Sequence, residues 1–157
     1  MTALVNDEIL PANERYATDF AKGALPMPAG RKFAVVTCMD ARLDPAKFLG
    51  LEEGDAHVIR NAGGIVTDDA LRSLLISHHL LGTEEVLVIG HSDCGMLTLR
   101  DEDVQEQLGT DITLHAFPNV ENRVSESVRA VRESPLLPDA VNGFVYEVET
   151  GRLRAVT

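Results

Sequence analysis

Two short stretches of the chain carry side chains that could bind a metal ion or perform catalysis. In the first, Cys38, Asp40 and Arg42 stand at alternate positions and bring together a thiol, a carboxylate and a guanidinium. In the second, two residues separate His91 from Cys94, so the two stretches hold both cysteines of the chain. Thiolate and imidazole are ligands that zinc favours, so the two stretches together predict a zinc site.

The number of soft ligands favours a catalytic zinc site over a structural one. Catalytic sites use three protein ligands and keep a fourth position for water, whereas a structural site would need a fourth protein ligand, for which Asp40 is best placed. Bound zinc lowers the pKa of its water to about 7, so an open site holds hydroxide near neutral pH. Asp40 is then expected to accept a hydrogen bond from that hydroxide, while Arg42 keeps Asp40 ionised and off the metal.

Each of the two stretches follows an apolar run that is typical of a buried strand. Such runs cover residues 33–36, 56–59 and 86–90, and helical patterns separate them along the chain. Strands that are apolar on both faces and alternate with helices predict a doubly wound α/β fold with a mostly parallel sheet. In a core order 2-1-3, with further strands outside it, the first and third strands are neighbours. Their carboxyl ends would bring Cys38 close to the second stretch.

The expected helices begin and end at recognisable residues. Thr67 or Asp68 caps the pattern with the best apolar stripe, and Gly82 ends it. Asp44 caps a short helix whose first position is a proline. The acidic run 101–103 is expected on the solvent side of its helix. The chain should finish with a strand and turn, and the expected helices cover residues 11–22, 45–49, 67–81, 97–108 and 120–133.

The length of the chain predicts a single domain. With 157 residues, 45% of them hydrophobic, the chain can bury one compact core but not two. We expect a zinc-enzyme domain over residues 1–157, in which 1–30 form an amino-terminal helical arm and 31–157 the α/β core. The proline-containing connector 25–30 is stiff and extended. A helix on such an arm packs either on a neighbouring subunit or on its own core.

The charge of the chain is strongly acidic. Its 14 basic and 25 acidic residues give a formal net charge of −11, which would repel phosphate backbones and anionic lipid surfaces. Neither nucleic acid nor a membrane is therefore an expected partner. The amino terminus lacks the pattern of a signal peptide, and no apolar run is long enough to span a bilayer. We expect a cytoplasmic protein, in which cysteines serve as metal ligands more often than in disulfides.

The two stretches also resemble a known family. Cys38-x-Asp40-x-Arg42 and His91-x-x-Cys94, with the sequence Arg-Asn-Ala-Gly between them, are similar to the motifs of the β-class carbonic anhydrases, particularly their short bacterial members. The resemblance extends over nearly the whole chain. It implies a zinc enzyme, with one Zn²⁺ per chain, that reversibly hydrates carbon dioxide to bicarbonate by attack of zinc-bound hydroxide. It also implies a homodimer or homotetramer with active sites near the subunit contacts.

The resemblance implies roles for individual residues. Asp40 and Arg42 would be the catalytic dyad, and Arg60 and Asn61 would give structural support. The non-catalytic bicarbonate site of the family requires a tryptophan, which this chain lacks. The implied zinc ligands are Cys38, His91 and Cys94, and the implied contacts to the substrate oxygen come from Gly63, Gly64 or the amide at Gly95.

Three other functions stay open at the level of sequence. Some relatives of the family hydrolyse carbonyl sulfide (COS) with the same ligands. A thiol hydrolase would use Cys38 as nucleophile, His91 as base and Asp93 to orient the histidine, but it leaves Cys94 without a role. If Asp93 has no such role, it is expected to serve the turn. A non-catalytic zinc-binding module would leave the pair of Asp40 and Arg42 unexplained.

Overall fold

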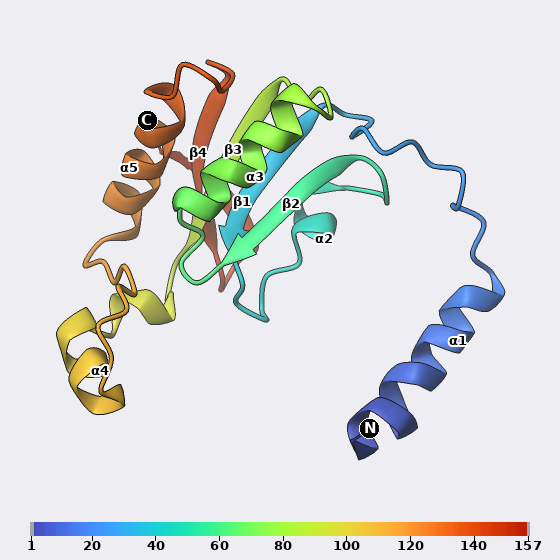
Figure 1. The fold of residues 1–157 in the computed structure, drawn as a ribbon, viewed down its shortest axis with the longest axis horizontal. Helices are drawn as coiled ribbons and strands as arrows, with labels where there is room; N and C mark the ends of the chain where they lie inside the picture. Colours follow the sequence, from blue (N-terminus) through green and yellow to red (C-terminus); the bar gives the residue numbers. More distant parts are fainter. Residues whose placement is uncertain (1, 157) are drawn as a thin grey trace.

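A five-stranded sheet forms the centre of the computed structural model, which describes residues 2–156. The strand order is β2-β1-β3-β4-β5, with β1 to β4 parallel and β5 antiparallel to β4 (Figure 1). The predicted mostly parallel sheet with core order 2-1-3 is therefore confirmed. The strands are β1 (Phe33–Cys38), β2 (Ala56–Asn61), β3 (Glu85–His91), β4 (Val141–Glu147) and β5 (Arg152–Val156).

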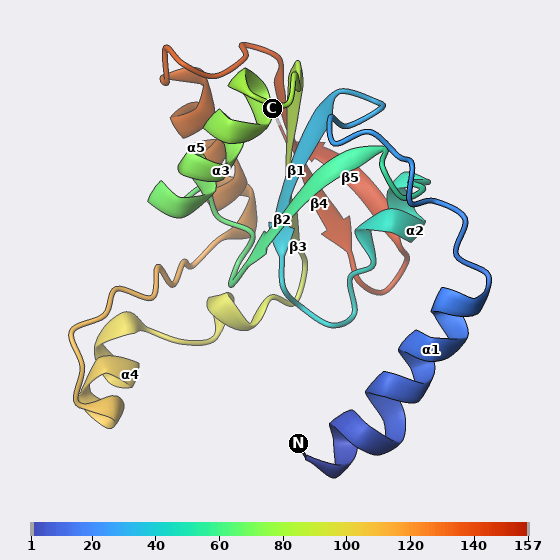
Figure 2. The same ribbon diagram turned by 45° about the vertical axis from the view of Figure 1, so that its right-hand side comes forward.

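Helices cover both faces of the sheet, with α3 and α5 on one face and α2 on the other (Figure 2). Two of them begin as predicted, because Thr67 accepts a hydrogen bond from the Ala70 amide to cap α3 and Asp44 accepts one from the Lys47 amide to cap α2. The α-helices are α1 (Leu10–Thr18), α2 (Pro45–Leu49), α3 (Asp68–His79), α4 (Asp101–Leu108) and α5 (Val120–Arg132). A π-helical turn, η1 (Val5–Ile9), precedes α1, and a 3₁₀ turn, η2 (Gly95–Leu97), follows β3.

Side chains of β1 supply both layers of the core, because successive residues of a strand point to opposite faces. Ala34 and Val36 pack towards α3 and α5, while Phe33 and Val35 pack with Ile89 on the α2 side. All six residues of β1 are buried, as the continuous apolar run predicted. This double burial fixes the end of β1, from which the first polar stretch emerges.

The expected helix over residues 97–108 is wrong at its beginning. The chain forms η2 and then an extended segment, and α4 begins only at Asp101. The Asp101 carboxylate accepts hydrogen bonds from the backbone amides of Leu114, His115 and Ala116 at 2.8 to 3.0 Å. Asp101 therefore anchors the loop that returns from α4, and the interpretation of 101–103 as only a solvated helix face is wrong for this residue.

The amino-terminal arm stands apart from the sheet (Figure 1). The expected helix over 11–22 is observed as α1, which starts one residue earlier and ends at Thr18. Neither η1 nor α1 contains a buried residue. Tyr16 and Lys22 of the arm form side-chain hydrogen bonds with Glu52 and Glu53, and the Gly30 amide donates to the Gly54 carbonyl oxygen. No helix in the described part of the chain is long and apolar enough to cross a membrane.

The contact between β3 and α5 leads to a first prediction. A Cβ atom at Gly90 would lie 2.7 Å from Val120 Cγ2 and 2.8 Å from Val124 Cγ2, and valine side chains have little freedom to move away. We expect Gly90→Ala to lower the free energy of unfolding by about 1–3 kcal/mol, measured by urea titration. Gly23→Ala is the matched control, because its Cβ would meet only Phe20 Cε1 at 3.8 Å. Equal stability of the two variants would contradict this packing argument.

Candidate metal centre

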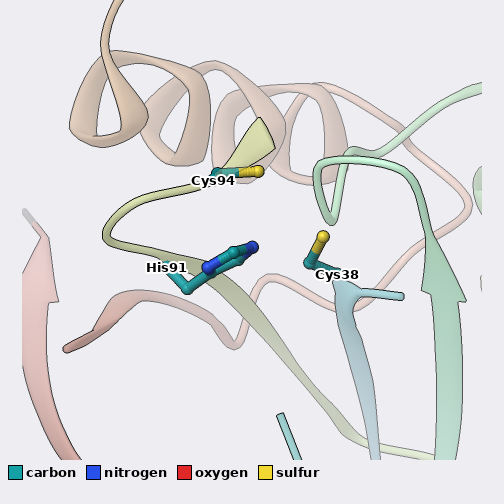
Figure 3. Close-up of side chains that lie close together, drawn as sticks. All are labelled: Cys38, His91 and Cys94. Atoms are coloured by element: carbon teal, nitrogen blue, oxygen red, sulfur yellow. The ribbon is translucent and has the colours of Figure 1, made fainter. Parts of the chain in front are cut away.

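The ends of β1 and β3 bring three metal-binding side chains together. Residues Phe33 to Thr37 of β1 pair with Glu85 to Ile89 of β3 in register, so both strands end at the same edge of the sheet. Figure 3 shows Cys38, His91 and Cys94 pointing toward one another. Their ligand atoms all lie within 4.8 Å of one another, and the three side chains are buried. The convergence expected from the 2-1-3 order is thus present.

The imidazole of His91 is oriented as a metal ligand requires. Its Nδ1 lies 2.9 Å from the carbonyl oxygen of Ser92, to which it donates a hydrogen bond in the tautomer that this contact selects. Its Nε2 is buried and has no hydrogen-bond partner among the described residues. A buried imidazole nitrogen without a partner is costly, and a metal ion between it and the two sulfur atoms removes that cost.

The two thiols also fit a divalent cation. The neighbouring Cys94 thiol lowers the pKa of Cys38, while Cys38 and burial raise the pKa of Cys94. A divalent ion lets both cysteines ionise, since metal ligands must be deprotonated. Two thiolates and one imidazole form a donor set typical of catalytic zinc.

Asp40 and Arg42 form a two-point ion pair beside these ligands. Arg42 Nε donates to Asp40 Oδ1 at 3.0 Å and Nη2 donates to Oδ2 at 2.8 Å, while the Arg42 amide also reaches Oδ1 at 2.9 Å. The side chain and then the backbone amide of Arg42 hold the pKa of Asp40 well below its usual range. Asp40 Oδ2 lies 3.8 Å from His91 Nε2, so the carboxylate borders the metal ligands while it is paired with the arginine.

A cavity of about 400 Å³ opens onto the ligands. Asp40, Gly63 and Gly95 line it together with the two cysteines. The rest of its wall is mostly apolar and comes from Met39, Ala62, Met96, Thr98 and Leu99. The site therefore combines soft metal ligands, a carboxylate and a largely apolar approach.

Comparison with known proteins identifies the family to which this arrangement belongs. A family model described as carbonic anhydrase matches residues 33–141. The chain is 46% identical to β-carbonic anhydrase 1 of Mycobacterium bovis over 161 aligned positions, with 98% of each chain covered. The chain belongs to the β-carbonic anhydrase family. The resemblance seen in the motifs is confirmed, and the family's zinc cofactor agrees with the donor set at the site.

Two further relatives show how far the likeness extends. The solved structure of a carbonic anhydrase from Glaciozyma antarctica has a TM-score of 0.92 and 43% identity, with full coverage of both chains. A carbon disulfide hydrolase from an Acidianus strain is 36% identical, over 94% of this chain and 87% of that one. The same fold and family thus include enzymes named for different small substrates.

Residues of β2 and of the loop that follows it support the site. Arg60 donates from Nε to the carbonyl oxygen of Cys38 at 2.9 Å and from Nη2 to that of Asp40 at 2.7 Å. Asn61 pairs through its side chain with both backbone groups of Ile65. At Gly64 φ is +63°, and a Cβ there would lie 2.8 Å from the Cys38 amide nitrogen. Gly64 is thus explained by close packing against the ligand strand, whereas Gly63 and Gly95 line the cavity.

The structure gives Asp93 a contact that the sequence did not suggest. The thiol-hydrolase alternative needs Asp93 to orient His91, but His91 Nδ1 faces the Ser92 carbonyl, and Asp93 Oδ2 lies 2.6 Å from Arg42 Nη1. The geometry therefore opposes that alternative. A carboxylate between two ligands was the only signal in the sequence, because its partner stands 51 positions away.

The orientation of His91 leads to a second prediction. We expect wild-type protein to hold about one zinc per chain and His91→Asn to lose most of it, measured by plasma emission spectrometry after dialysis. The matched control is His79→Asn, because His79 is exposed and bonds through Nε2 to the Leu136 carbonyl oxygen. Full zinc occupancy in His91→Asn would show that this imidazole is not a ligand.

Proposed function

We propose that this chain catalyses the reversible hydration of carbon dioxide to bicarbonate at the cavity above Cys38, His91 and Cys94. The observation that carries the proposal is the coexistence of three converging soft ligands with a carboxylate that is paired to arginine and borders them. A structural zinc site or a storage module gains nothing from such a carboxylate. Relatives that carry the name β-carbonic anhydrase over almost their whole length support the same activity.

The three ligands and the pair of Asp40 and Arg42 would have different roles in the reaction. Cys38, His91 and Cys94 would hold the zinc ion. Zinc supplies a Lewis acid that lowers the pKa of water to about 7, so that hydroxide is available near neutral pH. Asp40 stays ionised because Arg42 donates to both of its carboxylate oxygens. Asp40 can therefore accept a hydrogen bond from the reacting water, but it is too weak a base to take up the proton that this water loses. Asp40 would therefore orient the reacting water.

The cavity suits an uncharged linear substrate. Met39, Ala62 and Met96 give its wall an apolar character, which matches a molecule without charge or hydrogen-bond donors. We propose that backbone amides at Gly63 or Gly95 contact a substrate oxygen as its negative charge develops. The same role for Gly64 remains a prediction from the sequence.

Carbonyl sulfide is the second candidate substrate. It is also an uncharged linear molecule and would use the same ligands and the same cavity. The 36% identity to a protein named carbon disulfide hydrolase supports testing sulfur-containing substrates. A non-catalytic zinc-binding module is the alternative of another class, and it predicts metal binding without turnover.

A comparison of substrates on one preparation tests these functions, and a variant tests the role of Asp40. We expect stopped-flow measurements on zinc-analysed protein to show a higher kcat/KM for carbon dioxide than for carbonyl sulfide.

Asp40→Asn should lower kcat for carbon dioxide by about 10²-fold or more and retain its zinc, because a neutral amide is a weaker acceptor for the reacting water. Asp103→Asn is the control, since Asp103 forms an exposed pair with Arg100 and does not line the cavity.

The results separate the alternatives. Absence of any acceleration over buffer with either substrate, with zinc bound, would reject both catalytic functions and leave the non-catalytic module. A higher kcat/KM for carbonyl sulfide would replace the first candidate by the second. Loss of zinc in parallel with activity in Asp40→Asn would make Asp40 a ligand instead of an orienting group.

We also propose that a second copy of the chain covers the amino-terminal arm. The helical segment formed by η1 and α1 buries no residue, whereas helices in proteins gain most of their stability by packing an apolar face. Large apolar side chains of the arm are exposed instead of packed on the core: Leu4, Ile9, Leu10, Tyr16 and Phe20. A homodimer or homotetramer would bury them. A cytoplasmic location and the division into a 1–30 arm and a 31–157 core of one domain stay predictions from the sequence.

A charged substitution in the amino-terminal arm tests this assembly. We expect the wild type to have at least the mass of a dimer by light scattering, and Ile9→Asp to raise the dissociation constant of the dimer about tenfold or more. Leu136→Asp is the matched control, because Leu136 is equally exposed but lies outside the arm. If both variants associate as the wild type does, the arm does not hold the subunits together.

A further inference from the structure

We propose that Asp93 is a positioning residue that fixes Arg42 and thereby keeps the Asp40 carboxylate away from the metal ligands. The catalytic meaning of this role rests on the proposed function, but the geometry stands without it. Asp40 and Arg42 belong to one loop and are two residues apart. Their mutual pairing therefore leaves the pair free to move as a unit unless something outside the loop holds it.

The guanidinium of Arg42 joins the two loops that follow the ligand strands β1 and β3. One edge of it faces Asp40 through Nε and Nη2, at 3.0 and 2.8 Å. The other side faces Asp93, with Nη1 at 2.6 Å from Oδ2 and Nη2 at 2.8 Å from the backbone carbonyl oxygen. Asp93 lies between His91 and Cys94 in the loop after β3. It is thus the anchor that ties the Asp40–Arg42 pair to the second half of the metal centre.

The backbone of Asp93 is held in an unusual conformation for this contact. Its φ is +53°, in the left-handed region that few residues other than glycine, asparagine and aspartate adopt. In this conformation both the carbonyl oxygen and the carboxylate of Asp93 bond to Arg42. The left-handed φ therefore places both acceptors of Asp93 within hydrogen-bond distance of Arg42.

The contact matters because Arg42 has other acceptors nearby. Arg42 and Asp93 line a cavity of about 660 Å³ on the solvent side, together with Glu147 and Glu149. The Arg42 side chain is 48% exposed, so ordinary ion pairing alone would hold it weakly. Without Asp93, the guanidinium is free to turn toward these carboxylates and to leave Asp40.

If Arg42 no longer holds Asp40, the carboxylate has only a short distance to move to reach the metal ligands. Its Oδ2 is already 3.8 Å from His91 Nε2, and Arg60 holds the backbone carbonyl of Asp40 in place. Rotation of the side chain would bring the carboxylate to the point where the three ligand atoms converge. There it would compete with any external anion for the metal.

Cobalt-substituted protein gives a readout that does not depend on catalysis. We would titrate it with azide and follow the visible absorption of the metal, with cobalt content measured for every variant. Asp93→Gly keeps the left-handed backbone and the carbonyl acceptor but removes the carboxylate. We expect it to raise the dissociation constant for azide about tenfold or more. Asp93→Asn keeps an oxygen acceptor and tolerates the same φ, so it should remain within about threefold of the wild type.

A second substitution shows whether the effect passes through Asp40. In Asp93→Gly combined with Asp40→Asn, the competing carboxylate is absent, so the affinity for azide should return to that of Asp40→Asn alone. Asp69→Asn serves as the control, because it removes an exposed carboxylate that pairs with Arg72. A merely structural effect of Asp93 would lower the affinity equally in both backgrounds.

The possible outcomes decide the proposal separately from the proposed function. Azide affinity unchanged in Asp93→Gly, or a loss that Asp40→Asn does not reverse, would overturn the positioning role. Recovery in the double variant would support it. Failure of the wild type to hydrate carbon dioxide would reject the proposed function, while the azide titrations would still decide the role of Asp93.

Discussion

The metal centre depends on the direct pairing of β1 with β3 in a parallel sheet. Because both strands run in the same direction and end at the same edge, the last residue of each, Cys38 and His91, can be a ligand. The β2 loop must then fit against the same edge, and Gly64 allows its backbone to approach Cys38 where any Cβ would collide. Arg60 stabilises this contact by donating a hydrogen bond to the carbonyl oxygen of Cys38. The ligand positions are therefore set by the packing of three strands and not by the loops alone.

Burial of the ligands couples the metal to the stability of this edge. Two thiols and an imidazole lie in the core, where an unpaired polar nitrogen is expensive and two thiolates side by side repel each other. A divalent cation satisfies all three groups at once, so its binding energy also stabilises the folded arrangement. The Asp40 carboxylate does not need the cation to balance its charge, because Arg42 neutralises it. This separation lets the carboxylate act on a reacting molecule while the ligands act on the metal.

The sequence was sufficient for the sheet and the ligands but not for every residue around them. Continuous apolar runs identify parallel strands buried on both faces, and Thr67 and Asp44 cap their helices by local hydrogen bonds that spacing reveals. The start of α4 was misjudged because the leucines before it pack in a loop, and Asp101 is occupied by amides more than ten positions away. The contact of Asp93 with Arg42 is likewise tertiary, since a left-handed φ and a partner across the sheet edge leave no local pattern.

The charge of the molecule fits the chemistry proposed for the cavity. Two thiolates balance the charge of a zinc ion, and Arg42 shares its single charge between Asp40 and Asp93, so the immediate surroundings hold an excess of negative charge. The whole chain adds a formal net charge of −11. A field of this sign has no first-order effect on an uncharged substrate that enters through apolar walls, but it repels an anionic product. Entry of carbon dioxide and departure of bicarbonate are therefore both compatible with an acidic protein.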